Sequence, residues 1–519
     1  MTILRAAFCA ALFLFTTANL TLAQDVTLSS RDGSVTIRGM LMGYDGEFYR
    51  VETEFGELTV DGSGVVCEGP GCPNLQAFVA EMVISGAATT GEVLIPALIE
   101  AFGTRYGYAV TRETLEPGVV SYLLSERGGE RTAGRFTIHS GTTDSGFADL
   151  LANRADLVMA LREIRPDELR DAIAEGLGNL RAIGRNRVVA LDALVPIVAP
   201  GNPVVQLTLP QLSRLYSGEF DNWQAVGGPD APVVPHLLTA DTGLGQAVED
   251  RLMTPVGARL SRDAVRHSSD QALVDAVLAD PFAIGLTTAS KTGNAVQLGL
   301  SGACGFTVNA TRRSAKTEDY PLTAPVFLYM PARRLPKLAR EFLAYTRQPA
   351  AQLVIRRAGF VDQMPEEIPI EDQGARFANA IAQAGAEVSL VELQRMVRAL
   401  TPLKRLTTSF RFEAGSSLLD AQSRSNVEQL AAAMESGMYD GRQVVFVGFS
   451  DGQGDAAGNK RIAADRAQAV RGAVTRAART ADLDRIKLGV QAFGEAMPMA
   501  CDDSAWGRQV NRRVEVWVR

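Results

Sequence analysis

The stretch that decides the C-terminal fold is residues 444–469, which read VVFVGFSDGQGDAAGNKRIAADRAQA. Four apolar residues, 444–447, predict a short buried strand, and residues 448–454 predict a glycine-rich loop. Asp455 is a favourable N-cap, so we expect a helix from about residue 456 to residue 478. This order places the carboxylate of Asp451 at the end of the strand and the guanidinium of Arg466 on the helix that folds back over it.

Asp451 and Arg466 together suit a ligand that carries both an ammonium group and a carboxylate. An aspartate accepts charge-assisted hydrogen bonds from the ammonium, and a guanidinium holds a carboxylate through two parallel bonds. Spacing alone also fits an ordinary strand–loop–helix with a surface ion pair, which is the more common case and contributes about 0–1 kcal/mol. The choice between the two depends on the surrounding residues.

Those residues resemble the C-terminal peptidoglycan-binding domain of the OmpA family over roughly residues 407–519. The resemblance rests on Asp451, Gly454, Asn459, Ile462, Ala463, Arg466-Ala467 and Val470, on Phe410-Arg411-Phe412, Gly415-Ser416 and Leu419, and on Gly494-Glu495, Pro498, Gly507-Arg508 and Asn511-Arg512-Arg513-Val514-Glu515. It implies that Asp451 and Arg466 grip the diaminopimelate of the cell-wall peptide, with Asn459 in the same site. Phe449-Ser450 replace the family's usual His-Thr, and Ala463 replaces a frequent Ser, but both gripping charges remain.

Residues 1–23 predict a secretory signal peptide, because Arg5 precedes an apolar run that ends in small residues at Ala23. The run is too short to predict a membrane span, and no other stretch predicts a transmembrane segment. With the OmpA-like domain, this places the protein in the periplasm of a Gram-negative bacterium, at the cell wall, with association to the outer membrane left open. The net charge of −7 argues against nucleic acid as a partner.

Four cysteines follow the signal peptide: Cys67, Cys72, Cys304 and Cys501. In an oxidising compartment they are expected to form disulfides more often than metal sites. Cys67 and Cys72 enclose a tight Glu-Gly-Pro-Gly turn, which predicts a local bridge. Cys304 and Cys501 either pair across domains or remain two separate buried thiols. The chain has three histidines, and we predict neither a metal site nor a cofactor.

The remaining sequence predicts an α/β and α+β multidomain protein. Residues 24–73 contain five short strand patterns separated by turn signals, which predict a small SH3-like barrel or a β-meander. In residues 74–364 short apolar runs alternate with amphipathic helices, a pattern typical of an α/β domain with a mainly parallel sheet. Residues 365–404 begin with the proline-bracketed acidic run PEEIPIE and predict a linker and helix. Residues 405–519 form the OmpA-like βαβαβ domain.

Three loops rich in glycine and hydroxyl side chains precede helices in the middle domain, at residues 86–91, 140–146 and 239–245. Helix N-termini present backbone N–H groups and the positive end of the helix dipole, so such loops suit anions. Tight turns and caps also use these residue types. The candidate solute-binding residues are Thr89, Thr90, Ser140, Thr142, Thr143, Arg162, Asp241 and Thr242.

This region resembles the phosphate-binding type of periplasmic solute-binding protein, which implies two α/β lobes joined by crossing strands with the ligand between them. The resemblance rests on Ser85-Gly86 with Thr89, residues 96–102, Ala155-Asp156 with Met159-Ala160 and Arg162, Leu215-Tyr216-Ser217-Gly218 with Asn222-Trp223, Ala283-Ile284-Gly285, and Tyr320-Pro321-Leu322 with Pro325-Val326. Ala87, Leu161 and Leu244 stand where the family usually has hydroxyl donors. Each lost donor to a buried anion costs about 1.5–3 kcal/mol, so we expect phosphate binding to be weak or absent.

The sequence therefore predicts a binding protein and not an enzyme, because His139, His236 and His267 lack a nucleophile motif around them. Peptidoglycan is the expected partner of the last domain, and a small anion or polar solute is the expected ligand of the middle domain. The alternative is an envelope scaffold whose cleft no longer binds a solute. The sequence names no transporter partner.

Overall fold

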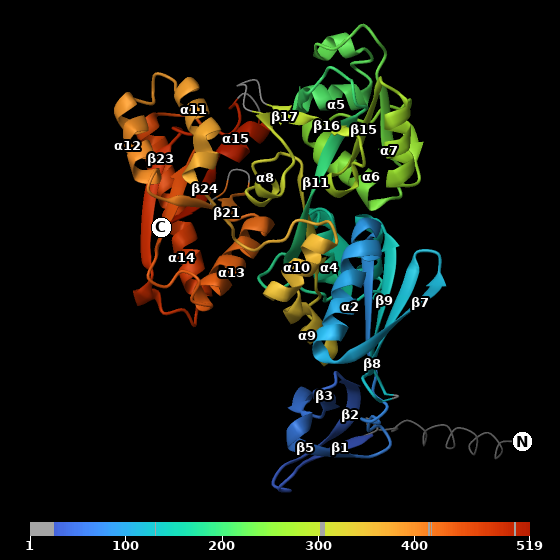
Figure 1. Ribbon diagram of the computed structural model, residues 1–519. Coiled ribbons are helices and arrows are strands. Elements are labelled where there is room, and N and C mark those ends of the chain that lie inside the picture. Colours follow the sequence, from blue (N-terminus) through green and yellow to red (C-terminus); the bar gives the residue numbers. More distant parts are fainter. Residues whose placement is uncertain (1–24, 130, 302–306, 414–415, 417, 503–504) are drawn as a thin grey trace, which may run out of the picture.

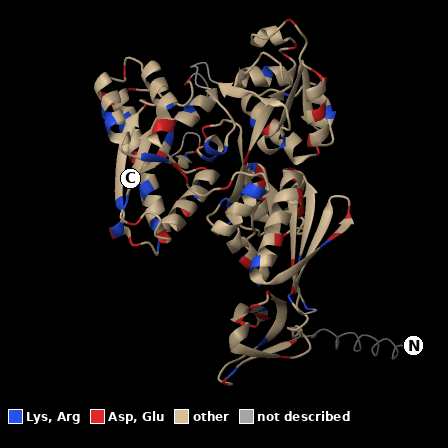
Figure 2. Cartoon of the chain, in the orientation of Figure 1, with Lys and Arg blue, Asp and Glu red and all other residues tan. Residues whose placement is uncertain are grey.

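The computed structural model describes residues 25–129, 131–301, 307–413, 416, 418–502 and 505–519. The predicted signal peptide and Cys304 lie outside these residues. A small N-terminal sheet, a two-lobed middle region and a C-terminal α/β body follow one another along the chain (Figure 1). In the described part of the chain, no helix combines the length and the apolar character needed to cross a bilayer. Basic and acidic residues are interspersed along the chain in all three bodies (Figure 2).

The N-terminal sheet is an antiparallel meander whose fifth strand pairs with its first, in the order β4-β3-β2-β1-β5. Its core is small and contains Val26, Leu28, Tyr49 and Val51. A disulfide joins Cys67 to Cys72, which confirms the predicted local bridge. The strands are β1 (Val26–Ser30), β2 (Thr36–Tyr44), β3 (Phe48–Thr53), β4 (Gly56–Asp61) and β5 (Val65–Glu68).

The middle region contains one continuous sheet that runs through both lobes in the order β14-β13-β15-β11-β19-β10-β6-β9-β8-β7. Strands β11 (Asn186–Val198) and β19 (Thr323–Tyr329) pair antiparallel and cross between the lobes, as the resemblance implies. Both strands are buried along almost their whole length. The fold is therefore the expected two-lobed one, with parallel pairs inside each lobe and antiparallel strands at the crossing and at the β9-β8-β7 edge of the first lobe.

The first lobe places helices α2, α3, α4, α9 and α10 around a mixed sheet. Its strands are β6 (Ala80–Ala87), β7 (Tyr108–Glu116), β8 (Val119–Glu126), β9 (Thr132–Gly141) and β10 (Leu157–Ala160), and its helices are η2 (Thr90–Leu94), α2 (Ile95–Tyr106), α3 (Thr143–Leu151), α4 (Pro166–Ala174), α9 (Lys337–Tyr345) and α10 (Pro349–Arg357).

The second lobe is smaller and begins where β11 leaves the first. Its elements are β12 (Gln206–Thr208), α5 (Leu209–Ser217), η3 (Trp223–Val226), β13 (Val234–Leu238), α6 (Gly243–Val248), η4 (Glu249–Met253), η5 (Thr254–Val256), β14 (Val265–His267), α7 (Asp270–Ala279), β15 (Ala283–Thr288), η6 (Ala289–Lys291), β16 (Val296–Gln297), β17 (Gly299–Ser301), β18 (Thr307–Val308) and α8 (Arg312–Lys316).

The C-terminal sheet has the order β20-β21-β24-β22-β23 and is covered on both faces. Because side chains alternate along a strand, Val444 and Phe446 pack under α13 and α14, whereas Val445 and Val447 pack against α11 and α12. The elements are β20 (Glu367–Ile368), η7 (Ile370–Gln373), α11 (Gly374–Ala382), α12 (Leu390–Leu400), β21 (Lys404–Arg411), α13 (Ala421–Glu435), β22 (Gln443–Phe449), α14 (Ala456–Ala477), η8 (Leu483–Arg485), β23 (Lys487–Gly494), α15 (Ala505–Asn511) and β24 (Arg513–Val518).

Residues 365–404, which we expected to form a linker and helix, are part of this C-terminal body. Strand β20 pairs with β21, and Met396 and Leu400 of α12 pack against Trp517 and Val447. The acidic run is short, and the amphipathic helices that follow it bury an apolar face on the sheet. The chain therefore passes from α10 of the first lobe to the C-terminal body with little free connection.

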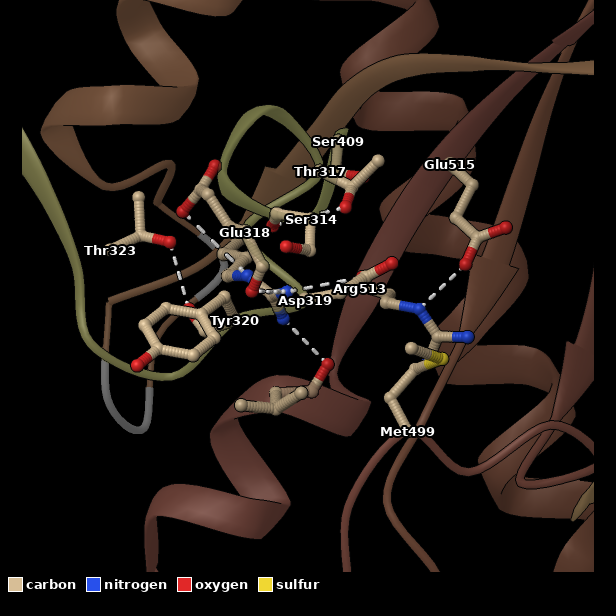
Figure 3. Close-up of polar contacts among 12 residues, drawn as sticks. Ser314, Thr317, Glu318, Asp319, Tyr320, Thr323, Ser409, Met499, Arg513 and Glu515 are labelled. Carbon is tan, nitrogen blue, oxygen red and sulfur yellow. Dashed lines mark hydrogen bonds and ion pairs between the residues drawn. The ribbon is translucent and has the colours of Figure 1, made fainter. Parts of the chain in front are cut away.

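A buried cluster of charges fastens the middle region to the C-terminal body (Figure 3). Asp319, which follows α8, accepts two hydrogen bonds from Arg405 of β21 at 2.7 and 3.1 Å. Glu515 of β24 contacts Arg405, Arg376 and Arg513. Burial alone would raise the pKa of Glu515, but the three guanidinium groups outweigh burial and hold that pKa well below its usual range. The interface is thus built around ionised groups of opposite charge that contact one another.

Candidate functional site

The predicted anchor residues come together at the carboxyl end of β22. Asp451 directly follows the strand, and Asp455 caps α14 by accepting a hydrogen bond from the N–H of Gly458 at 2.7 Å. The loop between them brings the next helix back over the strand end, as the local sequence predicts. Arg466 lies on α14, close enough to Asp451 for the two charges to interact, and we call this cluster of charges the anchor groove.

The groove contains a second guanidinium that the sequence analysis did not assign. Arg512 donates from Nη1 to Oδ2 of Asp451 at 2.6 Å, and both side chains are largely buried. Arg466 lies over the ring of Phe412, with its guanidinium carbon 5.2 Å from the ring centroid. Burial lowers the pKa of Arg466, the charge of Arg512 lowers it further, and Asp451 opposes both.

Arg466 has unused binding capacity. Among the described residues, no carboxylate lies within 4.0 Å of its guanidinium. A cation near a second cation and half removed from water gains from an incoming carboxylate. Asp451 in turn could exchange part of its contact with Arg512 for an ammonium group. The arrangement can therefore hold a zwitterion.

Asn459 has a different position from the one expected of a ligand contact. It is 3% exposed, and its side-chain amide donates to Oε2 of Glu495 at 2.6 Å. Burial raises the pKa of Glu495, and the bond from Asn459 opposes that effect. Asp502 accepts from the N–H of Gly452 at 2.6 Å and so fixes the loop after Asp451. Asn459 and Asp502 hold the rim of the groove in place.

The sequence contained a signal for Arg512 but not for its role. Asn511-Arg512-Arg513 belongs to the quoted OmpA-like motif, yet Arg512 is 61 residues from Asp451 and approaches it only because β24 pairs with β22. Adjacent Arg513 points to the opposite side and pairs with Glu515 inside the protein at 2.8 Å. Arg512 and Arg513 face opposite sides because successive side chains alternate along a strand. The sequence alone did not tell which of the two sides Arg512 would face.

The candidate solute-binding threonines mostly serve the local structure. Thr142 caps α3 by accepting from the N–H of Ser145 at 3.0 Å, and Thr242 caps α6 by accepting from the N–H of Gly245 at 3.0 Å. Thr143 Oγ1 accepts from the N–H of Leu161 at 3.1 Å. The hydroxyl-rich loops therefore behave largely as the caps that were the alternative interpretation of their composition.

The other candidates are dispersed. Thr89 precedes the helical turn Thr90–Leu94 without capping it, and Thr90 is fully buried with no partner for its Oγ1 among the described residues. Ser140 lies at the end of β9 close to Gly91, and Asp241 is exposed. These candidates lie on separate elements of the two lobes.

Arg162 is neutralised by carboxylates of the protein itself. It is 8% exposed, donates to both oxygens of Glu168 at 2.7 and 2.8 Å, and also contacts Asp144 and Asp250. Burial would lower its pKa, but the hydrogen bonds that it donates to Glu168 and Asp144 raise that pKa overall. A solute anion would have to compete with three carboxylates for this guanidinium.

The two lobes touch directly across the cleft. Arg165 of the first lobe donates to Asp250 of the second at 2.8 Å, and Arg251 of the second donates to the carbonyl of Leu161 at 2.9 Å. A methyl group added at Gly243 would lie 3.0 Å from Cβ of Ala87. The start of α6 therefore packs on the end of β6, where the family resemblance implies that a ligand enters.

The three positions that lack the usual hydroxyls explain this contact. Ala87, Leu161 and Leu244 are 0%, 6% and 1% exposed, and all belong to the same apolar cluster. Apolar side chains occupy the place of anion donors, so the lobes close over hydrocarbon. The departures seen in the sequence therefore have a structural counterpart.

Comparison with known proteins agrees with this architecture. Residues 80–349, more than half of the chain, match the PBP superfamily domain, and residues 411–512 match the OmpA family. Protein SphX of Synechococcus elongatus is 25% identical over 237 residues, which are 43% of this chain and 68% of that protein. The phosphate-binding protein PstS of Borreliella burgdorferi is 21% identical over 184 residues, 34% of this chain and 65% of that protein.

The chain thus spans about two thirds of the length of these curated relatives. Among solved structures, an ABC-type phosphate transport receptor from Vibrio cholerae is 18% identical, covers 54% of this chain and 99% of its own, and has a TM-score of 0.42. The chain belongs to the PBP superfamily and carries an OmpA family domain after its PBP domain.

Proposed function

We propose that the protein is a periplasmic binding protein of a Gram-negative bacterium that is anchored to the cell wall. Its OmpA family domain binds the diaminopimelate of peptidoglycan non-covalently, and its middle domain binds a small polar solute. The family memberships support a solute-binding and peptidoglycan-binding role, since both families consist of binding proteins. Residues 24–73 are proposed to be a docking or spacer module.

The observation that carries the anchor is the charge arrangement around Asp451. One carboxylate and two guanidinium groups share a groove, and Arg466 has no carboxylate within ion-pair distance in the described part of the chain. The D-centre of meso-diaminopimelate carries an ammonium and a carboxylate at a fixed separation. Asp451 would take the ammonium and Arg466 the carboxylate, with Arg512 available to either partner.

Co-sedimentation with purified sacculi tests the anchor. The mature chain should pellet with peptidoglycan of the diaminopimelate type and should stay in the supernatant with peptidoglycan that has lysine at this position, which lacks the second carboxylate. Free meso-diaminopimelate should compete for binding. Equal sedimentation with both wall types would refute recognition of the D-centre.

A second candidate is an envelope scaffold whose cleft no longer binds a solute. The closed lobes and the neutralised Arg162 favour it. A thermal-shift panel of small anions and polar solutes separates the two functions. A solute receptor gains stability with a ligand by mass action, whereas a scaffold shows no shift with any compound and still pellets with sacculi.

A further inference from the structure

A cavity of about 420 Å³ lies where both lobes meet the C-terminal body. Glu163 after β10, Arg251 of η4 and Glu318 after α8 line it from the middle region, and Asp420, Gln422 and Trp506 line it from the C-terminal body. This volume falls within the usual range for small-molecule sites, about 300–1,000 Å³. Because segments of both bodies form its walls, the cavity exists only while the two bodies are docked.

Four carboxylates line this cavity, those of Glu163, Asp250, Glu318 and Asp420. Glu163 accepts from the N–H of Ala421 at 3.2 Å, so an acid of the first lobe binds at the start of α13 next to that helix's own cap, Asp420. Burial raises the pKa of Glu163, and the charge of Asp420 raises it further. Burial and Asp420 likewise raise the pKa of Glu318 to about 8, with Arg411 and Arg251 opposing and Asp319 adding to the rise.

Two buried acceptor atoms on the cavity wall lack a donor within the described part of the chain. They are Oε1 of Glu318 and Oε1 of Gln422, and Gln422 is 4% exposed. A buried acceptor without a donor costs about 1–3 kcal/mol. Since both orphan atoms are acceptors, a molecule that satisfies them must bring N–H or O–H groups.

The three arginines that line the cavity are mostly engaged by the protein. Arg162 contacts Glu168, Asp144 and Asp250, and its Nε, 3.4 Å from Asp250, is the one of its nitrogens without a hydrogen bond among the described residues. Arg251 donates to the carbonyls of Leu161 and Thr323 at 2.9 and 2.7 Å. Arg411 donates to the carbonyls of Val510 and Glu318 at 2.6 Å each. Trp506 lines the same cavity, and an indole ring attracts cations through its face. The wall therefore combines free acceptors, carboxylates and an aromatic ring.

We propose that this cavity binds a small solute that carries an ammonium group, held by Glu318, Asp420 and Gln422 with Trp506 beside it. The proposal rests on the solute-binding role proposed above and specifies the solute as a cation, in contrast to the phosphate bound by the PstS relative. Since residues from the lobes and from the C-terminal body contribute, the solute would also strengthen the docking of the two bodies.

Isothermal titration of the mature chain with ethanolamine, tetramethylammonium and inorganic phosphate, each at pH 6.5 and pH 8.5, tests this proposal. Ethanolamine should bind with a Kd of about 1 mM or lower, and more tightly at pH 8.5, where Glu318 is ionised. Tetramethylammonium should bind about tenfold more weakly, because it cannot donate hydrogen bonds.

Glu318→Gln and Asp420→Asn should each weaken ethanolamine binding about tenfold, whereas exposed Glu175→Gln should not. Asparagine caps helices as well as aspartate, so Asp420→Asn keeps the start of α13.

The outcomes separate this inference from the functions on which it rests. If phosphate binds and ethanolamine does not, solute binding stands and the cationic class is wrong. If ethanolamine binds equally to all variants, this cavity is not the site. If no compound binds at either pH, the inference falls together with solute binding, while sedimentation with sacculi still reports on the anchor independently.

Discussion

The anchor groove and the interlobe cleft both place an arginine near an aspartate at the end of a strand, yet the two arginines are in opposite states. Arg162 is bound to Glu168, Asp144 and Asp250, whereas Arg466 faces Arg512 and an aromatic ring. Free binding capacity, and not the mere presence of a charged residue, separates a site that can take an anion from one that cannot. In the anchor groove the guanidinium of Arg466 is available to a ligand, whereas in the interlobe cleft the guanidinium of Arg162 is already paired with carboxylates of the protein.

The largest effect that tests this contrast is on stability. If the cleft is packed as core, Leu244→Ala should lower the free energy of unfolding by about 2–5 kcal/mol, because it removes buried methyl groups and leaves a cavity. The melting temperature should fall by roughly 5–15 °C. Exposed Leu353→Ala is the matched control and should change stability by less than about 0.5 kcal/mol.

Differential scanning calorimetry, with and without sacculi, measures the melting temperatures of these variants and of the wild type. Leu244→Ala should still pellet with peptidoglycan below its melting temperature, because the anchor groove is formed by the other body. A variant as stable as the wild type would mean that the lobes stand open in solution and that the cleft is accessible.

The second effect is on the anchor. Asp451→Ala and Arg466→Ala should each weaken sacculus binding by roughly ten- to a hundredfold, since each charge-assisted hydrogen bond contributes about 1.5–3 kcal/mol. Arg466→Lys should also fail, because an ammonium cannot make the paired contact with a carboxylate. Co-sedimentation at graded peptidoglycan concentrations gives the affinities.

Asp465→Asn, an exposed neighbour on the same helix, is the control and should bind like the wild type. Circular dichroism should show all four variants folded, because Asp451 and Arg466 lie at the rim of the groove. If both alanine variants pellet normally while folded, the two residues do not form the anchor.

These two sites also show how far the sequence reaches. Local signals predicted β22, the cap at Asp455 and the start of α14, because each depends on residues a few positions apart. The OmpA-like pattern selected Asp451 and Arg466 but not Arg512, which reaches Asp451 only through strand pairing.

The interlobe cleft shows more strongly that contacts between residues far apart in the sequence are not predicted by local patterns. The missing hydroxyls at Ala87, Leu161 and Leu244 were visible in the sequence, and they form part of one apolar cluster. The carboxylates that occupy Arg162 come from α3, α4 and η4, which the fold alone brings together. The same holds for Asp319, whose partner Arg405 is 86 residues away in the other body.

The third effect is a pH dependence at the junction between the bodies. An unfolded glutamate titrates near pH 4.3, and burial with the charge of Asp420 raises the pKa of Glu318 to about 8. Between these values the folded protein holds a proton that the unfolded chain has lost. Stability from this group is therefore complete below about pH 4.5 and is lost as the pH rises to 8.

Glu318→Gln should remove the loss of stability that accompanies the rise in pH. The stability of the wild type should fall by about 1–2 kcal/mol more than that of the variant between pH 5.5 and pH 8.5, after a discount for relaxation and solvent access. Thermal melts of both proteins at matched ionic strength measure the difference, and Glu175→Gln serves as the exposed control. Parallel pH profiles for the wild type and Glu318→Gln would show that Glu318 is already ionised in the folded protein.

The smallest expected effect is that of phosphate on the wild-type chain. Phosphate would have to displace Asp144, Glu168 and Asp250 from Arg162, separate Arg165 from Asp250, and enter a contact lined by Ala87, Leu161 and Leu244. Of the threonine hydroxyls, that of Thr242 already donates to the carbonyl of Thr239, and those of Thr142 and Thr143 are oriented by the backbone N–H groups that they accept. Calorimetric titration should therefore show no saturable heat below about 1 mM, the affinity that corresponds to roughly −4 kcal/mol.

Restoring one hydroxyl with Ala87→Ser should not create binding, because the carboxylates around Arg162 remain. A sub-micromolar Kd for phosphate would require the lobes to open and Arg162 to exchange its partners at little cost. It would show that Arg162, like Arg466, is available to a ligand, and that its contacts with carboxylates belong only to the unliganded protein.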